Sequence, residues 1–394
     1  MKILIISFYY SPDLCAGSFR ATALVEAMLR KTPAEAHIDV LTTAPNRYST
    51  FAVEAPAAEE AERLSISRIQ LPAHRSGMAD QSRAFGVFSR GVLKAVRDKH
   101  YDIVIGTSSR LMTAVLSAYV AKRKRARLYL DIRDIFVDTI KDVLPRKFAA
   151  PAKPIFALAE HWAVSRADRV NLVSQGFSNY FETRYPRQQR SFFTNGIDEE
   201  FLRGESSESH YTPGGMLEIL YAGNIGEGQG LHDILPQLAI KLQGRASFTV
   251  IGDGGRKEAL ANALVAAGAR NVTLLAPMPR QQLIDHYGKA DVLFLHLNDY
   301  AAFRKVLPSK IFEYAAMKKP ILAGVAGFPA EFLQREVTNC AIFPPCDAEA
   351  AIKALDRLAI VETVREDFVH RYGRSRIMDD MADDILSLMD GKRE

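Results

Sequence analysis

The sequence Pro308-Ser309-Lys310-Ile311-Phe312-Glu313-Tyr314 lies between two apolar runs, Asp291–His296 and Lys319–Gly324. The runs have the length of buried strands, and the segment between them begins with a proline and a serine, which commonly open a helix. A helix start leaves backbone N–H groups unpaired, and at the carboxyl edge of a parallel sheet it can bind phosphate. Lys310 adds positive charge there, and the Glu313 carboxylate can accept hydrogen bonds from a sugar hydroxyl. The stretch therefore predicts a site for a nucleotide or a nucleotide-sugar.

The same alternation of short apolar runs and helix-like segments extends along the whole chain. Runs that predict strands lie at 2–7, 38–43, 102–107, 128–132, 169–174 and 191–194, and again at 217–222, 247–251, 271–275, 291–296, 320–323 and 340–343. Continuous apolar strands separated by helices are typical of a parallel sheet covered on both faces. Two such series in 394 residues predict two doubly wound, Rossmann-like α/β domains, each with its own core.

A polar, turn-rich stretch between residues 195 and 215 marks the expected domain boundary. We expect residues 1–200 to form the N-terminal domain and residues 201–374 the C-terminal domain. The remaining segment, 375–394, predicts an amphipathic helix with acids on its polar face. Its apolar face carries Ile377, Met381, Ile385 and Leu388.

Composition narrows the possible classes of protein. The three cysteines, Cys15, Cys340 and Cys346, are widely spaced and form neither a disulfide framework nor a metal cluster, which predicts a reducing cytoplasm. No paired metal ligands occur at a useful spacing, so we expect no metal, and we expect no cofactor. The apolar N-terminus is too short for a signal peptide and predicts the first strand of a sheet, and no later run reaches the length of a membrane span. The loop at 223–230 matches the dinucleotide fingerprint only loosely, which argues against a dehydrogenase.

Positive charge is concentrated in the first half of the chain. Residues 1–200 hold 29 Lys and Arg against 21 Asp and Glu, a net charge of +8, whereas the rest has a net charge of −3. The segments 122–127 and 146–164 are cationic, and the second also contains Phe148, Ile155 and other apolar residues. A cationic amphipathic helix can lie in a membrane interface. The alternative is a helix that packs on the sheet with a basic rim, and nothing resembles a nucleic-acid-binding module.

Glycine-containing loops follow several predicted strands. Glycine lets the backbone approach a ligand closely, so these loops are candidates for binding the nucleotide. The candidate residues are Gly17 in the first half and Gly223, Asn224, Gly226, Gly252, Asp253 and Gly254 in the second.

Asp131 and Arg133 end a predicted strand of the first domain and point to the same side of it, and Asp134 follows directly. A carboxylate at a strand end can act as a general base or bind an acceptor hydroxyl. A salt-bridged pair that closes the strand is the structural alternative. His296 also ends a strand, and we interpret it as a side chain satisfied by its neighbours rather than as a catalyst.

Taken together, these motifs resemble a GT-B-fold glycosyltransferase of family 4 over nearly the whole chain. The motifs are Ser11-Pro12 with Gly17, Asn195–Asp198, Tyr221–Gly226, Gly252–Gly254, Pro308–Tyr314 and Lys319–Ile321. The form of the 308–314 stretch, together with Asp131-Ile132-Arg133-Asp134, is similar to the branch of bacterial L-fucosamine and related N-acetylated deoxysugar transferases. That branch builds O-antigen, capsule or related surface glycans on a polyprenyl-diphosphate carrier.

The resemblance implies two Rossmann-like domains facing a cleft, with the C-terminal helix crossing back to the first domain. It implies retaining transfer from a UDP-sugar on the second domain to a lipid-linked saccharide on the first, by a protein peripheral on the inner face of the cell membrane. Glu313 would bind the ribose hydroxyls, while Ser309 and Lys310, with Pro308 beside them, would meet the diphosphate. The glycine loops would line the nucleotide, and Gly17 would make room for the phosphate.

The chain departs from the family pattern at the position eight residues before Glu313, where Lys305 stands in place of a second glutamate. The candidates for stabilising the leaving diphosphate are therefore Arg304, Lys305, Arg256 and Lys310. Arg133 lies where many members carry a histidine, which leaves the group that activates the acceptor open.

Two other functions fit the same architecture. A nucleotide-sugar 2-epimerase would need several carboxylates and histidines in both domains, and this chain offers few. A non-catalytic nucleotide-sugar-binding partner of a glycan assembly complex would be compatible with the missing first glutamate.

Overall fold

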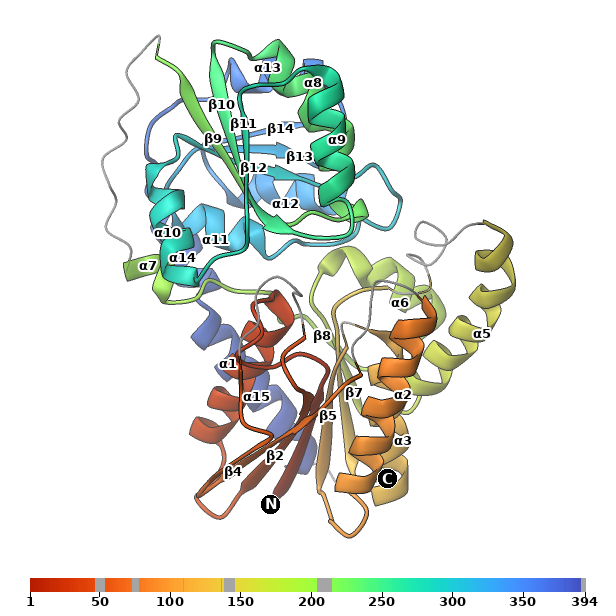
Figure 1. Cartoon of the computed structure of the whole chain (residues 1–394). Coiled ribbons are helices and arrows are strands. Elements are labelled where there is room, and N and C mark those ends of the chain that lie inside the picture. The colour runs from red at the N-terminus through yellow and green to blue at the C-terminus, as the bar shows by residue number, and fades with distance from the viewer. Residues whose placement is uncertain are drawn as a thin grey trace. The chain divides into compact units, whose positions relative to one another are not determined.

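The computed structural model describes residues 1–46, 54–72, 78–108, 110–135, 137, 146–203 and 215–390. The chain forms two compact units, one of Met1–Thr194 with Ser375–Glu394 and one of Asn195–Arg374 (Figure 1). The segment 195–200, which we expected in the N-terminal domain, belongs to the second unit, where Ile197 packs in the core.

The first unit is built on an eight-stranded sheet with the order β3-β4-β2-β1-β5-β6-β7-β8. Its strands are β1 (Lys2–Ser7), β2 (His37–Thr43), β3 (Ala58–Ala61), β4 (Leu64–Ile69), β5 (Ile103–Ser108), β6 (Arg127–Ile132), β7 (Arg169–Leu172) and β8 (Arg190–Ser191). All neighbouring strands are parallel except the β3–β4 pair. The central strand β1 is buried from Ile3 onwards because helices cover both faces of the sheet.

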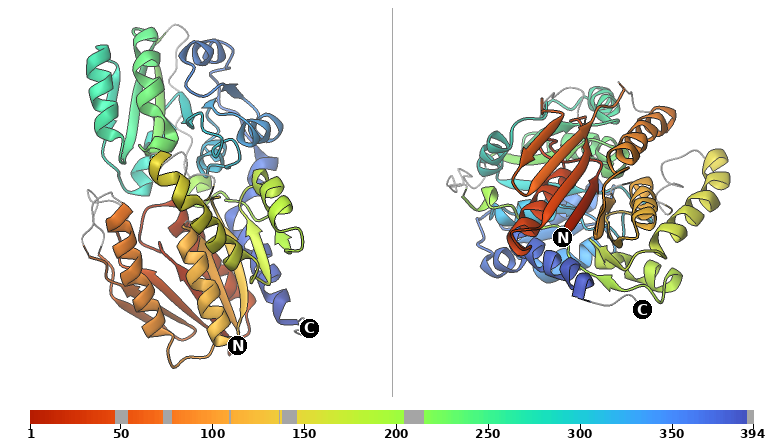
Figure 2. Two further views of the ribbon diagram at one scale, coloured as in Figure 1. Left: turned by 90° about the vertical axis from the view of Figure 1, so that its right-hand side faces the viewer. Right: turned by 90° about the horizontal axis from the view of Figure 1, so that it is seen from below.

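The helices of the first unit lie in two layers. They are α1 (Ala16–Lys31), α2 (Met78–Ala95), α3 (Leu111–Lys124), α5 (Arg146–Val164), α6 (Ser178–Arg184) and α15 (Arg374–Asp390). Helices α2, α3 and α5 run side by side over one face, and the left view of Figure 2 looks onto them. Helices α1 and α15 lie together on the opposite face, where Arg30 pairs with Asp379 at 2.7 Å and Lys31 with Asp383 at 2.6 Å.

The second unit contains a six-stranded sheet with the order β11-β10-β9-β12-β13-β14, in which every pair is parallel. Its strands are β9 (Leu217–Asn224), β10 (Ala246–Asp253), β11 (Val272–Leu275), β12 (Val292–His296), β13 (Ile321–Gly324) and β14 (Cys340–Phe343). Its helices are α7 (Glu200–Arg203), α8 (Leu231–Lys241), α9 (Lys257–Ala267), α10 (Arg280–Lys289), α11 (Lys310–Ala316), α12 (Phe328–Glu336), α13 (Ala348–Leu355) and α14 (Glu366–Tyr372). Separate hydrophobic clusters fill the two sides of this sheet.

Every strand predicted from an apolar run is present with small shifts at the ends, except that β8 overlaps the predicted 191–194 only at Ser191. Both sheets are covered on both faces, and all their strand pairs are parallel, as the pattern predicts, apart from β3–β4. The apolar face of the last helix is buried as expected, with Met381 and Ile385 inaccessible to solvent. The described helices include none that combines the length and hydrophobicity of a membrane span.

Candidate functional site

The glycine loops of the second unit lie next to each other at the carboxyl edge of its sheet. Strands β9 and β10 pair so that Gly223 faces Gly252 and Asn224 faces Asp253. Gly252 has φ +152°, and a Cβ there would overlap the carbonyl oxygen of Gly223. Gly254 has φ +156°, and its Cβ would come within 2.5 Å of the Ile225 oxygen. The two loops can therefore approach this closely only because these positions are glycine.

Backbone hydrogen bonds hold the two loops as one surface. The amide of Ile225 donates to Asp253 O at 2.8 Å, and the amide of Arg256 donates back to Ile225 O at 2.9 Å. Within the first loop, Asn224 Nδ2 donates to Gln229 Oε1 at 2.8 Å. The predicted nucleotide-binding residues Gly223, Asn224, Gly226, Gly252, Asp253 and Gly254 thus lie on one rigid edge.

Helix α11 brings Lys310 and Glu313 to this edge. Glu313 is only 6% exposed, and its Oε2 accepts from Lys310 Nζ at 2.9 Å and from the Tyr287 hydroxyl at 3.3 Å. A Cβ on Gly223 would lie 3.1 Å from Lys310 Cε, so the lysine stem rests on the glycine loop. The Tyr314 hydroxyl anchors the helix by accepting from the Ala222 amide at 3.1 Å.

Helix α11 begins at Lys310, directly after Pro308 and Ser309, as the sequence predicts. Ser309 has helical dihedral angles, φ −60° and ψ −27°, and its side chain makes no capping hydrogen bond. The turn is instead closed through the backbone, because Ile311 donates to Pro308 O at 3.2 Å. A contact of Pro308 or Ser309 with a phosphate stays a prediction.

Two of the other three candidate cations of the second unit, Arg256 and Arg304, pair with acids. Arg256 forms an ion pair with Glu227, and hydrogen bonds from Tyr300 and Arg256 outweigh the effect of burial and hold the pKa of Glu227 below its usual range. Arg304 pairs with Asp299 at 2.8 Å on the surface. Lys305 follows Arg304 in a turn in which its amide donates to Ala302, and its role in catalysis stays a prediction.

The side chain of His296, at the end of β12, connects this strand with Gln229 and with Cys346. Its Nδ1 lies 2.6 Å from Gln229 O, and its Nε2 accepts from the Cys346 amide at 2.9 Å. These contacts require a neutral ring with the proton on Nδ1, and burial lowers the pKa of His296 to about 4. The interpretation of His296 as a satisfied structural histidine agrees with this geometry.

In the first unit, Gly17 and Arg133 meet at the carboxyl edge of the sheet. Gly17 lies in the first turn of α1, and a Cβ there would come within 2.6 Å of Arg133 Nη1. A larger side chain at position 17 would therefore displace the guanidinium. Asp134 directly follows Arg133, two residues beyond the end of β6, and is exposed.

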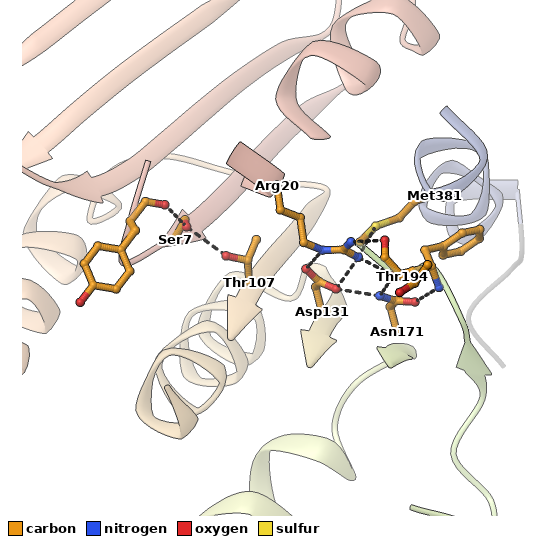
Figure 3. Close-up of polar contacts among 9 residues, drawn as sticks. Ser7, Arg20, Thr107, Asp131, Asn171, Thr194 and Met381 are labelled. Atoms are coloured by element: carbon orange, nitrogen blue, oxygen red, sulfur yellow. Dashed lines mark hydrogen bonds and ion pairs between the residues drawn. The ribbon is translucent and has the colours of Figure 1, made fainter. Parts of the chain in front are cut away.

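Asp131 is fully buried and its partner is Arg20 of α1, not Arg133 (Figure 3). Arg20 Nε and Nη2 donate to the two carboxylate oxygens at 2.8 and 2.9 Å, and Asn171 Nδ2 donates to Oδ1 at 2.7 Å. Arg20 also donates to the backbone oxygens of Phe193 and Thr194. The geometry favours a structural carboxylate, and a catalytic role for Asp131 stays an untested prediction.

Sequence reasoning missed Tyr287 and Asn171 because neither belongs to a motif. Among the described residues no group of three His, Cys, Asp or Glu is placed to hold a metal ion, and metal independence stays a prediction.

Comparison with known families now defines the class of protein. The model "Glycosyl transferase 4-like domain" matches residues 19–196, and "Glycosyl transferases group 1" matches residues 203–374. The chain is therefore a glycosyltransferase of the GT-B fold and belongs to family 4.

One sequence relative agrees with this class, and three solved structures share the fold. The putative colanic acid biosynthesis glycosyl transferase WcaI of Escherichia coli K12 is 26% identical over 368 residues, which cover 87% of each chain. Sucrose-phosphate synthase from Thermosynechococcus elongatus has a TM-score of 0.73 at 16% identity and full coverage of both chains. HepE of Anabaena, solved with UDP and glucose, has a TM-score of 0.67 at 14% identity, covering 98% of this chain and 99% of HepE. WaaG, a glycosyltransferase involved in lipopolysaccharide biosynthesis, has a TM-score of 0.64 at 12% identity, covering 98% and 97%.

Proposed function

We propose that the protein moves an N-acetylated (deoxy)hexosamine from a UDP-sugar, with retention of configuration, to a polyprenyl-diphosphate-linked saccharide. The product would be a bacterial surface glycan such as O-antigen or capsule. The observation that carries the donor assignment is the cluster of partly exposed Lys310 with buried Glu313 and Tyr287 against Gly223. The UDP complexes of HepE support the nucleotide, and the names of WcaI and WaaG support a surface-glycan product.

Glu313 has one carboxylate oxygen that can bind a ligand. Oε2 of Glu313 binds Lys310 and Tyr287, whereas no residue in the described ranges donates to Oε1. Oε1 can therefore accept a ribose hydroxyl without breaking the ion pair. When the bond between the sugar C1 and the diphosphate breaks, negative charge grows on the leaving group, and Lys310 is positioned to stabilise it.

On the acceptor side, Arg133 and Asp134 are the stronger candidates for touching substrate. Both oxygens of Asp131 are already bound by Arg20, and Asn171 adds a third hydrogen bond. Arg133 and Gly17 adjoin each other, so a phosphate group at the start of α1 would meet the guanidinium.

We place the enzyme in the cytoplasm, peripheral on the inner face of the cell membrane. A polyprenyl-linked acceptor is anchored in that membrane, and the net charge of +8 over residues 1–200 suits an anionic surface.

A single substitution tests the donor assignment. The Glu313→Ala protein should lose both the rise in melting temperature on adding UDP and the transfer of sugar, because a ligand stabilises only the state that binds it. Glu349→Ala is the matched control, since Glu349 is an exposed carboxylate of the same unit that pairs with Lys241. Transfer by Glu313→Ala at the normal rate would show that the donor-site assignment is wrong.

The same assay separates the proposed transferase from the two alternatives. The epimerase alternative predicts conversion of a UDP-N-acetylhexosamine to its epimer without any acceptor. The binding-partner alternative predicts a thermal shift with UDP-sugar but neither transfer nor epimerisation. Sugar incorporation into a lipid-linked saccharide supports the proposal over both.

A further inference from the structure

Strand β14 lies at the edge of the second unit's sheet and pairs only with β13. The amide of Ile321 donates at 3.2 Å to the oxygen of Asn339, directly before β14, so Asn339 turns its carbonyl toward β13. Because successive residues of a parallel strand direct their backbone groups to opposite sides, the N–H and C=O groups of Cys340 and Ile342 point away from the sheet. The described part of the chain provides no hydrogen-bond partner for them on that side. The edge can therefore still pair with another strand.

A groove of about 510 Å³ runs along this free edge. Strand β14 and helix α13 line it, whereas no residue of β13 does, so the groove lies on the unpaired side of β14. Ala350 and Ala354 face it from the helix, and their small side chains leave room beside the strand. Lys353 and Arg357 line the same wall. The groove therefore places open space directly beside unpaired backbone groups.

The groove is cationic because no carboxylate lines it. Lys353 and Arg357 are exposed, and the described part of the chain provides no ion pair for either of them. The two acids of the same segment, Glu349 and Asp356, are each bound by a basic residue from elsewhere in the unit. The C-terminal end of a helix carries about half a negative unit charge, which offsets only part of two positive charges. The groove therefore attracts a ligand with negative charge.

The two faces of β14 differ in chemistry. Ala341 packs toward α13, whereas Cys340 and Ile342 pack toward the hydrophobic cluster on the opposite side of the sheet. The side chains of an added strand alternate in the same way, so every second one would lie beside the two cations and the others beside Ile342. Val361, which is 57% exposed, adds apolar surface at the start of the strand, where Asn339 Nδ2 donates to its oxygen at 3.0 Å. A matching strand therefore alternates acidic and apolar residues.

We propose that β14 binds an extended segment of a partner protein as an added strand, with acidic residues on the α13 side and apolar residues on the other. Backbone pairing gives such a complex its affinity, and Lys353 and Arg357 select the acidic side chains. A second copy of this chain fits less well. Two antiparallel β14 edges related by a two-fold axis would bring both pairs of cations to the same face of the joined sheet. A free anion would meet the cations but leave the backbone groups unpaired.

Fluorescence anisotropy of the full chain with labelled synthetic peptides tests the proposal. The probe alternates glutamate and valine, and the comparison peptide alternates lysine and valine. The wild type should bind the acidic peptide about tenfold more tightly than the basic one, and binding should weaken as salt is added. Lys353→Gln/Arg357→Gln should bind the acidic peptide about tenfold more weakly, because both charges beside the peptide are lost. The control Arg270→Gln/Lys289→Gln loses the same charge at exposed positions outside the groove and should bind as the wild type does.

Backbone pairing has its own test. Alternate amides of an added strand face β14, so the acidic peptide is methylated either on all its glutamate amides or on all its valine amides. One of these two peptides should lose binding at least about tenfold, and the other should keep it. In the protein, Ile342→Pro removes an outward donor without touching the pairing with β13, and should weaken binding more than Ile342→Ala, which loses the side chain but keeps the donor. Thermal melting followed by circular dichroism shows that each variant is folded.

The proposal is overturned if Lys353→Gln/Arg357→Gln binds the acidic peptide as the wild type does, or if the two methylated peptides bind equally. Absence of binding at about 1 mM acidic peptide also overturns it. A dimer of the wild type in sedimentation velocity that Ile342→Pro dissociates would assign this edge to a second copy and overturn it as well. The thermal shift with UDP is measured on every variant. A protein that binds UDP but no peptide contradicts strand addition alone and leaves the proposed donor site standing.

Discussion

Tyr287 lies at the centre of the candidate donor site although it belongs to no recognisable motif. Its hydroxyl donates to Glu313 Oε2 and accepts from Lys310 Nζ at 3.2 Å. Burial, followed by the charge of Glu313, raises the pKa of Tyr287 well above its ordinary value. The phenol therefore keeps its proton for the carboxylate, and it fixes the two side chains to which we assign donor binding.

Replacing Tyr287 with Phe tests this positioning role. We expect the KM for the sugar nucleotide to rise about fivefold, since a hydrogen bond contributes about 1 kcal/mol, with kcat nearly unchanged. Tyr180→Phe is the control, because it removes another buried hydroxyl that donates to a carboxylate, Glu160 in the first unit. A fall in kcat at constant KM would assign Tyr287 to the chemical step instead.

A substitution at Gly252, which adds one Cβ atom, tests whether the two glycine loops pack this closely. In Gly252→Ala the new Cβ would collide with the Gly223 carbonyl, at a φ of +152° that side chains rarely adopt. We expect a loss of more than about 2 kcal/mol in the stability of the second unit and loss of the thermal shift with UDP. Gly244→Ala, with φ +81° and no atom within 4 Å of its Cβ, should cost only about 1 kcal/mol. Equal melting temperatures for the two variants would contradict the close packing of the loops.

At the scale of elements, the sequence predicts those strands and helices that a local pattern of apolar residues determines. Buried parallel strands such as β1 and β12 are visible as apolar runs, and the amphipathic pattern of α15 identifies its buried face. The β3–β4 hairpin was missed because β3, Ala58–Ala61, is an exposed edge strand with two glutamates in four residues. The partner of Asp131 was also missed, because Arg20 is 111 positions away and only the packing of α1 on the sheet brings the two together.

The Arg20–Asp131 pair links α1 to β6, and its loss should be costly. Asp131→Asn keeps the volume but leaves a buried guanidinium without its counter-charge, so we expect about 3–5 kcal/mol of destabilisation. Arg30→Gln removes an exposed ion pair with Asp379 and should cost less than about 1 kcal/mol. Thermal melting and activity are measured together. An Asp131→Asn protein that is stable but inactive would support a catalytic role for Asp131.

The His296 contacts between β12, Gln229 and Cys346 make the second unit sensitive to acid. The pKa of His296 is lowered to about 4 in the folded state, against about 6.5 unfolded, so the unfolded chain binds more protons between these values. Stability contributed by the neutral ring is complete above pH 6.5 and is lost as the pH falls toward 4, by up to about 3 kcal/mol. Melting temperature measured across this range should fall less steeply for His296→Gln. A wild-type curve with the same slope as the variant would refute the assignment.

At the scale of the whole molecule, the chain passes between the two units twice, after Thr194 and after Arg374. The two passages are joined within the second unit, where Ile197 forms a parallel bridge with Gly373. Asp198 accepts hydrogen bonds from Arg374 and Arg280 beside that bridge. The first unit is completed by residues that follow the entire second unit in sequence. The amphipathic pattern at 375–389 suggests that this last segment packs on another part of the protein, but only the fold shows that it packs on the first unit.

Asp384 is the residue through which α15 contacts several strands of the first unit. It pairs with Arg169 and accepts hydrogen bonds from the hydroxyls of Tyr129 at 3.0 Å and Ser191 at 2.7 Å, so one carboxylate near the end of the chain ties together β6, β7 and β8. We expect Asp384→Asn to destabilise the first unit by about 1–3 kcal/mol, since it weakens three partly buried contacts at once. Asp380→Asn makes the same charge change at an exposed site and should stay within about 0.5 kcal/mol of the wild type. Limited proteolysis should then cut first in the first unit of Asp384→Asn. Cleavage that begins in the second unit would show that α15 does not stabilise the fold in this way.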